Sequence, residues 1–87
     1  IAYEPVWSIG TGKILKNNEL ADIVISIKKF VKKFLKTKQD IRVLYGGSVD
    51  KKTISNFKSI RELDGFLIGG ASKSSKNFID IIKNFYK

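Results

Sequence analysis

A short apolar run, a turn containing glycine or serine, and an amphipathic stretch follow one another three times along this chain. The apolar runs cover residues 1–3, 41–45 and 65–68. Brief, nearly continuous apolar runs are typical of parallel strands that are covered on both faces. Strands that alternate with helices predict parallel pairing through right-handed crossovers. The sequence therefore predicts an α/β fold of about three βα units with parallel strands.

Helical periodicity follows each apolar run. The longest stripe covers about four turns, with Asn17 or Asn18 as its N-cap, and consists of Leu20, Ile23, Val24, Ile27, Phe30, Val31 and Phe34. A shorter helix is expected over about residues 51–59, with Asp50 as its N-cap and with Ile54 and Phe57 pointing inward. The last helix is expected over about residues 75–85, and its apolar side consists of Phe78, Ile81, Ile82 and Phe85.

Two architectures fit three consecutive βα units: an open doubly wound sheet and part of a (β/α)8 barrel. Three units cannot close a barrel of eight strands, so a barrel assignment makes this chain the last third of one. The chain begins at Ile1 and contains no methionine, and we therefore expect a piece of a longer protein. In both architectures, functional residues gather where the strands end, here at Glu4, at 46–48 and at 69–70.

The composition excludes several classes of function. The chain has no cysteine, which rules out disulfides and thiolate metal sites, and no apolar run approaches the about 18 residues of a membrane helix. The net charge of +9 is a feature of nucleic-acid-binding domains. However, the lysines of the first predicted helix lie on its polar side, with no aromatic residues among them to stack on bases: Lys28, Lys29, Lys32, Lys33 and Lys36. We interpret this side as a solvated face, and expect neither a nucleic-acid nor a membrane partner.

Glu4 is the candidate general base. It ends the first apolar run and precedes Pro5, whose ring restricts Glu4 to an extended backbone. A loop tipped with two glycines follows, and such a loop can swing over an anionic substrate and offer it backbone N–H groups. The alternative is an ordinary solvated carboxylate at a strand end. Trp7 fits either core filler or a hinge, and Lys13 fits either a loop charge or a hinge residue.

Paired glycines follow the second and third apolar runs, in Gly46-Gly47-Ser48 and in Gly69-Gly70. Glycine pairs let backbone N–H groups converge on a phosphate, and a short helical turn at Ala71-Ser72 would add its dipole. Either pair alone is more often a tight βα turn. Two pairs at corresponding positions favour a phosphate cradle. The sequence contains neither the Walker A motif nor the glycine motif of dinucleotide-binding folds.

Three motifs of this chain resemble those of the triosephosphate isomerase family. They are Ala-Tyr-Glu-Pro-Val-Trp-Ser-Ile-Gly-Thr-Gly-Lys at 2–13, Tyr-Gly-Gly-Ser-Val at 45–49, and Asp-Gly-Phe-Leu-Ile-Gly-Gly-Ala-Ser at 64–72. They occur in the family's order and spacing, and the resemblance to the C-terminal third of the family covers essentially the whole chain. It implies a partial TIM (β/α)8 barrel, in which residues 1–87 are the C-terminal fragment of a single domain.

The resemblance also implies roles for individual residues, since this family is a known example of glutamate-base catalysis and of loop gating. Glu4 would move a proton between adjacent carbons of dihydroxyacetone phosphate and D-glyceraldehyde 3-phosphate, through an enediol or enediolate. The substrate phosphate would be held by Gly10, Ser48, Gly69 and Gly70. A closing lid and its hinges would include Pro5, Val6, Trp7, Ile9, Gly12 and Lys13. The closed lid would be latched by Tyr45 and Ser48, and Glu4 would be clamped by Ile9 and Leu67.

The resemblance implies a small phosphorylated triose as substrate, and neither a metal nor an organic cofactor. The family's lysine and neutral histidine come from earlier strands, and this chain contains no histidine, so we expect the 87 residues alone to be inactive. The full-length protein is expected to be a cytoplasmic homodimer, with its main interface in the missing N-terminal part. The alternative hypothesis is an inactive phosphate-binding (βα)3 module.

Overall fold

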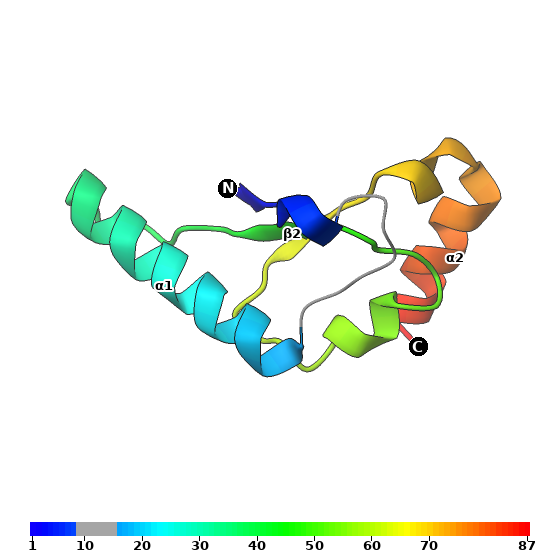
Figure 1. The fold of residues 1–87 in the computed structure, drawn as a ribbon, viewed down its shortest axis with the longest axis horizontal. Coiled ribbons are helices and arrows are strands. Elements are labelled where there is room, and N and C mark those ends of the chain that lie inside the picture. The colour runs from blue at the N-terminus through cyan, green and yellow to red at the C-terminus, as the bar shows by residue number, and fades with distance from the viewer. Residues whose placement is uncertain (9–15) are drawn as a thin grey trace.

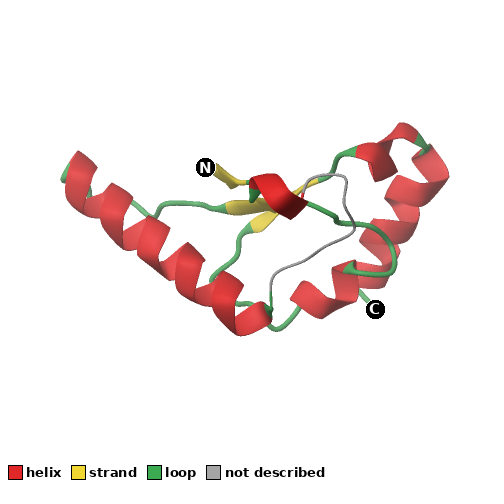
Figure 2. Cartoon of the chain, in the orientation of Figure 1, coloured by secondary structure: helices red, strands yellow, loops and turns green. Residues whose placement is uncertain are grey.

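The computed structural model describes residues 1–8 and 16–87 (Figures 1 and 2). The candidate residues Ile9, Gly10, Gly12 and Lys13 lie outside the described residues. The elements in chain order are β1 (Ala2–Tyr3), η1 (Val6–Ser8), α1 (Asn17–Leu35), β2 (Leu44–Gly46), η2 (Ile54–Phe57), β3 (Gly65–Leu67), η3 (Gly70–Lys73) and α2 (Ser75–Phe85), where η denotes a short 3-10 helix.

The three strands form one parallel sheet in the order β1-β2-β3. This order confirms the predicted α/β fold with three parallel strands. The register pairs Tyr3 with Tyr45, and Tyr45 with Phe66. β1 and β3 are the edges of this sheet, and no strand of the described residues pairs with their outer sides. The strand expected over residues 41–45 is shorter than predicted, because β2 begins only at Leu44.

The core lies on one face of the sheet. The row Tyr3, Tyr45 and Phe66 points toward it, and Leu20 and Val24 of α1 are fully buried there. An aromatic chain continues from this row, with ring centroids 5.1 Å apart for Tyr45 and Phe57, 5.5 Å for Phe57 and Phe66, and 5.6 Å for Phe66 and Phe85. Stacked and tilted rings of this kind dominate the energy of a small core.

The opposite face of the sheet differs from the prediction that the strands are covered on both faces. Ala2 and Glu4 are exposed there, and Leu67 is 45% exposed. The helices whose side chains enter the core, α1, η2 and α2, pack on the face of Tyr45, and so the described residues supply only one helical layer. The uncovered face is the one that presents Glu4.

Helix α1 begins three residues before its first buried side chain and ends at Lys36, whose φ of 52° is left-handed. The predicted N-cap is wrong: Lys16 occupies that position without a side-chain hydrogen bond. Asn17 lies in the first turn instead, and its side-chain amide donates to Asn56 O and, at 3.1 Å, to Ser59 Oγ. The amide therefore joins α1 to the segment that follows η2.

The inward orientation expected for Phe30 and Phe34 is also wrong. They are 69% and 75% exposed, and their rings stack on each other at 6.1 Å. Figure 1 shows the reason, since the last turns of α1 project beyond the sheet. Their apolar stripe continues past the point where the described residues provide anything to cover it.

The helix expected over residues 51–59 is mostly a turn, and only Ile54–Phe57 forms a 3-10 helix. The side chains of Asp50 and Thr53 bond to backbone groups at the start of this segment, and these bonds satisfy the first N–H groups of the turn. The backbone N–H groups of Lys52 and Thr53 donate to Asp50 Oδ1 at 2.8 and 2.9 Å, and Thr53 Oγ1 donates to Ser48 O at 3.1 Å. Ile54 and Phe57 are nevertheless buried, as predicted.

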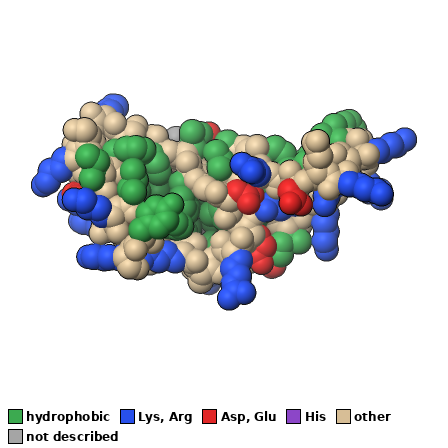
Figure 3. All heavy atoms as spheres, turned by 180° about the vertical axis from the view of Figure 1, so that it is seen from behind, with side chains coloured by type: hydrophobic (Ala, Val, Ile, Leu, Met, Phe, Trp, Pro, Cys, Tyr) green, Lys and Arg blue, Asp and Glu red, His purple; other side chains and the backbone are tan. Residues whose placement is uncertain are grey.

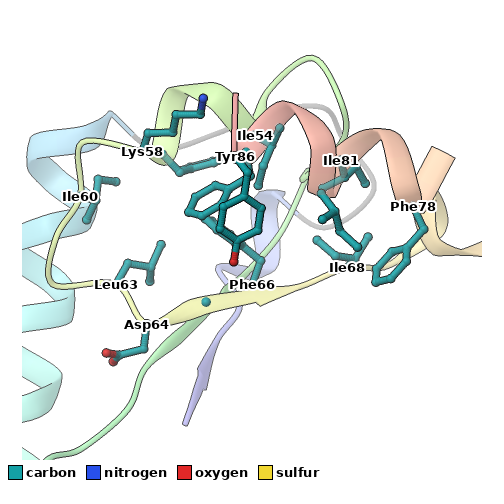
Figure 4. Close-up of a pocket in the computed structure, with 14 residues that line it drawn as sticks. Ile54, Lys58, Ile60, Leu63, Asp64, Phe66, Ile68, Phe78, Ile81 and Tyr86 are labelled. Carbon is teal, nitrogen blue, oxygen red and sulfur yellow. The ribbon is translucent and has the colours of Figure 1, made fainter.

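Helix α2 has the predicted bounds, and Ser74 Oγ caps it by accepting from Asn77 N–H at 3.3 Å. Ile81 is buried as expected, but Phe78 and Ile82 are 39% and 45% exposed. Both line an apolar pocket of about 280 Å³ between β3, η2 and α2. Figure 4 shows Phe66, Ile68, Phe78 and Ile81 around this pocket. The described residues therefore cover the inward face of α2 only in part.

The charged surface is distributed rather than concentrated. On the face shown in Figure 3, lysine and arginine side chains spread around the outline, and hydrophobic side chains are open to solvent between them. Among the helices of residues 1–8 and 16–87, none is long and apolar enough to cross a bilayer.

Candidate active site

The predicted site residues meet at the carboxyl ends of the three strands. Glu4 follows β1, Ser48 lies two residues beyond β2, and Gly69 lies two residues beyond β3. Because the strands are parallel and in register, their carboxyl ends lie at the same end of the sheet. The structure thus brings together a carboxylate and two glycine-containing loops that are 40 residues or more from the carboxylate in sequence.

Glu4 leans across Gly46 toward Leu67. A methyl group built on Gly46 would lie 2.7 Å from Glu4 Cγ, 3.2 Å from Glu4 Cδ and 3.4 Å from Leu67 Cβ. The Glu4 side chain is exposed among the described residues. Leu67, predicted as one half of a clamp, lies beside Gly46 and is 45% exposed, and the other half, Ile9, lies outside the described residues.

Ser48, Gly69 and Gly70 line one hollow of about 300 Å³, whose other lining residues are Gly47, Val49, Asp50 and Ala71. A side chain added at Gly69 or Gly70 would meet no atom within 4 Å, so the backbone there faces open space. Gly10, the fourth predicted phosphate ligand, lies outside the described residues. The hollow is lined by two glycine-containing loops, one after β2 and one after β3.

The turn at Gly69 is fixed by Ser72. The backbone N–H and the hydroxyl of Ser72 both donate to Gly69 O, at 2.9 and 2.6 Å. These bonds close the short helical turn η3, which confirms the helical turn predicted at Ala71-Ser72. The carbonyl of Gly69 is therefore occupied inside the turn.

Asp50 is the one carboxylate that lines this hollow among the described residues. Partial burial acts to raise its pKa, but the backbone N–H groups of Thr53 and Lys52 and the charge of Lys52 hold the pKa below its usual value. The turn therefore stabilises the ionised form of Asp50. The role predicted for Asp50, a cap, is confirmed in kind, although it caps a turn rather than an α-helix.

Tyr45 is fully buried, and its hydroxyl has no hydrogen-bond partner within the described part of the chain. The ring contacts Phe57 in the core. A buried hydroxyl without a partner costs about 1–3 kcal/mol relative to a satisfied one, so its retention needs a reason. Packing alone would be served equally well by phenylalanine.

The predicted hinge residues lie immediately beyond β1. Pro5 is buried, and η1 follows it with Val6 85% exposed and Trp7 49% exposed. The exposure of Trp7 contradicts the alternative that it is core filler. Lys13 lies outside the described residues.

No contact between Gly46 and Glu4 was predicted from the sequence, and neither Val49 nor Asp50 was named as a lining residue of the hollow. The pairing of Tyr3 with Tyr45 places the next residues of both strands side by side, so a register assignment would have found the first contact.

Within residues 1–8 and 16–87, no cluster of three or more histidine, aspartate or glutamate side chains could hold a metal ion.

Comparison with known proteins shows one family. The sequence model described as "Triosephosphate isomerase" matches residues 1–85. Similar curated proteins include the triosephosphate isomerases of Zygosaccharomyces bailii, 48% identical, of Saccharomyces cerevisiae, 44% identical, and of Dictyoglomus thermophilum, 43% identical, each over 86 residues. These matches cover 97% of this chain but 34% of each relative, so the chain spans about a third of their length. With a family match over nearly all its residues, the chain belongs to the triosephosphate isomerase family.

Proposed function

We propose that this chain is the C-terminal (βα)3 portion of a triosephosphate isomerase and carries the base, the lid and most of the phosphate site. Glu4 and the hollow of Ser48, Gly69 and Gly70 lie at the same end of the sheet. This placement is the observation that carries the proposal. A phosphate bound in that hollow would leave the carbon end of a triose to extend toward the carboxylate. That arrangement suits proton transfer on a small phosphorylated substrate.

In the proposed reaction, the Glu4 carboxylate takes a proton from one carbon of dihydroxyacetone phosphate and returns it to the adjacent carbon. The C–H electron pair becomes the carbon–carbon double bond of an enediol or enediolate, and the carbonyl electron pair moves onto its oxygen. A proton passes from the neighbouring hydroxyl oxygen to that oxygen, and protonation at the other carbon re-forms a carbonyl and gives D-glyceraldehyde 3-phosphate. No electrons or atoms enter or leave. The developing oxyanion needs an electrophile. This chain contains no histidine, so the family's histidine and lysine would come from outside these 87 residues.

The proposed lid begins at Pro5, Val6 and Trp7, and extends through Ile9, Gly10, Gly12 and Lys13. Tyr45 and Ser48 are proposed as its latch, and Leu67 as half of the clamp over Glu4. Two observations support these assignments. The Tyr45 hydroxyl is buried without a partner among the described residues, and Leu67 lies on the far side of Gly46 from Glu4.

The barrel is likewise a proposal, and it rests on surfaces that the described residues leave uncovered. Both sheet edges are open, and Phe30, Phe34, Phe78 and Ile82 are exposed although they belong to apolar helix stripes. Further βα units on either side would cover them. We propose that residues 1–87 are one part of a single barrel domain, and that the full-length protein is a cytoplasmic homodimer whose main interface lies in the preceding part.

The test is the Glu4→Gln substitution in the full-length protein that contains this sequence. Gln keeps the size of Glu but is not a base, so we expect kcat to fall on the order of 10²–10⁴-fold while KM changes far less. Glu19→Gln is the matched control, since Glu19 is an exposed residue in the first turn of α1 and lies outside the site. A loss confined to KM, or an unchanged kcat, would contradict the base role.

The isolated 87-residue chain provides a second measurement. We expect no isomerase turnover from it, because the electrophilic side chains are absent. Turnover by the isolated chain that disappears with Glu4→Gln would overturn this part of the proposal.

The alternative is a phosphate-binding module without catalysis, which would use the same hollow of Ser48, Gly69 and Gly70. Titration of the isolated chain with inorganic phosphate, followed by the amide NMR signals of Ser48, Gly69 and Gly70, separates the two functions. Saturable shifts together with a full-length protein that lacks turnover would favour the module.

A further inference from the structure

Gly46 is buried directly beneath the side chain of Glu4. A Cβ on Gly46 would lie 2.7 Å from Glu4 Cγ, a separation that real Cβ atoms essentially never show. The aliphatic part of Glu4 therefore occupies the space that any side chain at position 46 would need. The contact involves the middle of the Glu4 side chain rather than its tip.

Backbone conformation does not explain the glycine. The φ of Gly46 lies outside the left-handed range, and Gly46 is paired in register with Leu67 within the sheet. Alanine can adopt such a strand conformation without strain. What excludes a side chain at position 46 is the presence of Glu4, and not the local turn.

Gly65 offers an internal comparison on the same face of the sheet. A Cβ there would lie 2.9 Å from Leu44 Cδ2, which is equally crowded. However, that atom is the terminal methyl of a flexible apolar side chain, and a rotation would remove it. At Gly46, the crowded atom is Cγ, so relief requires a change of χ1 that carries the Glu4 carboxylate to a new place.

We propose that Gly46 is a positioning residue for Glu4: its missing side chain creates the gap in which the Glu4 side chain lies across β2 toward Leu67. The gap directs the carboxylate across the sheet, along the row of neighbouring positions 4, 46 and 67 near the carboxyl ends of the strands. The consequence for catalysis rests on the proposed base role of Glu4, whereas the placement itself does not.

The catalytic test is Gly46→Ala in the full-length protein. A misplacement of about 1 Å can cost on the order of 10²-fold in rate, so we expect kcat to fall by about that factor with a much smaller change in KM. Gly65→Ala, with comparable crowding but no contact with Glu4, is the matched control and should leave kcat within a few-fold. Equal kcat losses in both variants, or none in Gly46→Ala, would overturn the positioning role.

The placement is tested separately by a double-mutant cycle on the full-length protein, with urea unfolding as the readout. Gly46→Ala should lower the urea midpoint when residue 4 is glutamate. It should do so much less when Glu4→Ala has removed the Cγ and Cδ atoms that cause the clash. If Gly46→Ala alone does not fold and the double variant does, the coupling is established in its strongest form. An equal loss in both backgrounds, or unfolding in both, would overturn the proposal, because the glycine would then serve the backbone.

The two experiments distinguish a failure of the positioning role of Gly46 from a failure of the proposed base role of Glu4. Coupling in the cycle combined with a normal kcat for Glu4→Gln would mean that the placement holds and the base role fails. Absence of coupling combined with a large kcat loss for Glu4→Gln would mean that the base role stands and Gly46 does not position it.

Discussion

Val43 and Asp64 are joined by two hydrogen bonds that run in opposite directions. The backbone N–H of Val43 donates to Asp64 Oδ2 at 2.7 Å, and the backbone N–H of Asp64 donates to Val43 O at 3.0 Å. Lys28 of α1 adds an ion pair to the same oxygen at 2.9 Å, and its Nζ also donates to Glu62 O at 2.6 Å. One carboxylate thus ties α1 to the segments that lead into β2 and β3.

Replacement of Asp64 should show which of these contacts matters most. Asp64→Ala leaves the N–H of the fully buried Val43 without its acceptor, and we expect a loss of about 1–3 kcal/mol in the free energy of unfolding. Asp64→Asn keeps an acceptor oxygen but loses the ion pair with the partly exposed Lys28, so its loss should be clearly smaller. Chemical denaturation of both variants measures the difference. Asp40→Asn is the control, since that carboxylate is fully exposed, and a similar loss there would contradict the assignment.

Acid should destabilise the fold through the same carboxylate. Partial burial acts to raise the pKa of Asp64, but the Val43 N–H and the Lys28 ammonium hold the pKa below its usual value. A folded-state pKa below the unfolded value gives stability that is present above the unfolded pKa, about 3.9, and is lost as the pH falls through the folded pKa. Asp50 contributes with the same sign.

We therefore expect the unfolding free energy to be level from about pH 6 to pH 5 and to fall below about pH 4. The decrease should be shallower in Asp64→Asn, because one linked group is removed. Urea unfolding across this pH range measures both slopes. Identical slopes for the parent and Asp64→Asn would refute the linkage to Asp64.

Lys36 should be replaceable by glycine with a gain in stability. Its φ of 52° and ψ of 40° are left-handed, and its backbone N–H donates to the last carbonyls of α1. A residue with a Cβ costs about 1–2 kcal/mol in that conformation, whereas glycine adopts it freely. We expect Lys36→Gly to raise the free energy of unfolding by about 1 kcal/mol. Lys38→Gly, at an exposed position without a left-handed φ, should stabilise nothing, and a gain there equal to that at Lys36 would point to removal of charge instead.

Truncation of two phenylalanines should change the stability of the fold by very different amounts. Phe57 is 1% exposed and contacts the rings of Tyr45 and Phe66, so Phe57→Ala should cost about 3–5 kcal/mol and partly or fully unfold the chain. Phe34 is 75% exposed, and Phe34→Ala should change stability by no more than about 0.5 kcal/mol. Thermal unfolding followed by circular dichroism compares them. A large loss for Phe34→Ala would show that the projecting end of α1 is covered in the isolated chain.

Periodicity in the sequence predicted which residues form α1 and α2, but not how much of each apolar side would be covered. Leu20 and Val24 lie over the sheet, whereas Phe30 and Phe34 continue the same stripe beyond its end. An apolar stripe shows which side chains of a helix can be buried. The length of the strands beneath the helix determines which of them are buried. The helix expected over residues 51–59 forms only as the 3-10 helix Ile54–Phe57, although Asp50 bonds to the backbone at its start as a cap would.

Most of the candidate site that can be checked was visible in the sequence, because each candidate follows an apolar run. Parallel pairing then brings Ser48 next to Gly69 and Gly70 without further information. The contact between Glu4 and Gly46 was not visible, since it depends on which residues of β1 and β2 stand opposite each other. Strand bounds were too uncertain to assign that register, and β2 began three residues later than its apolar run.

The row of positions 4, 46 and 67 has a consequence for which changes of length this chain can absorb. All three positions are set by strand register, and a slip of β2 by one residue toward its carboxyl end would replace the glycine gap with the ring of Tyr45. The connections at 37–43 and 58–64 enter the strands from the opposite end of the sheet. Insertions there would lengthen the molecule away from Glu4, whereas a single residue inserted between Tyr45 and Ser48 would shift one wall of the site relative to the other two.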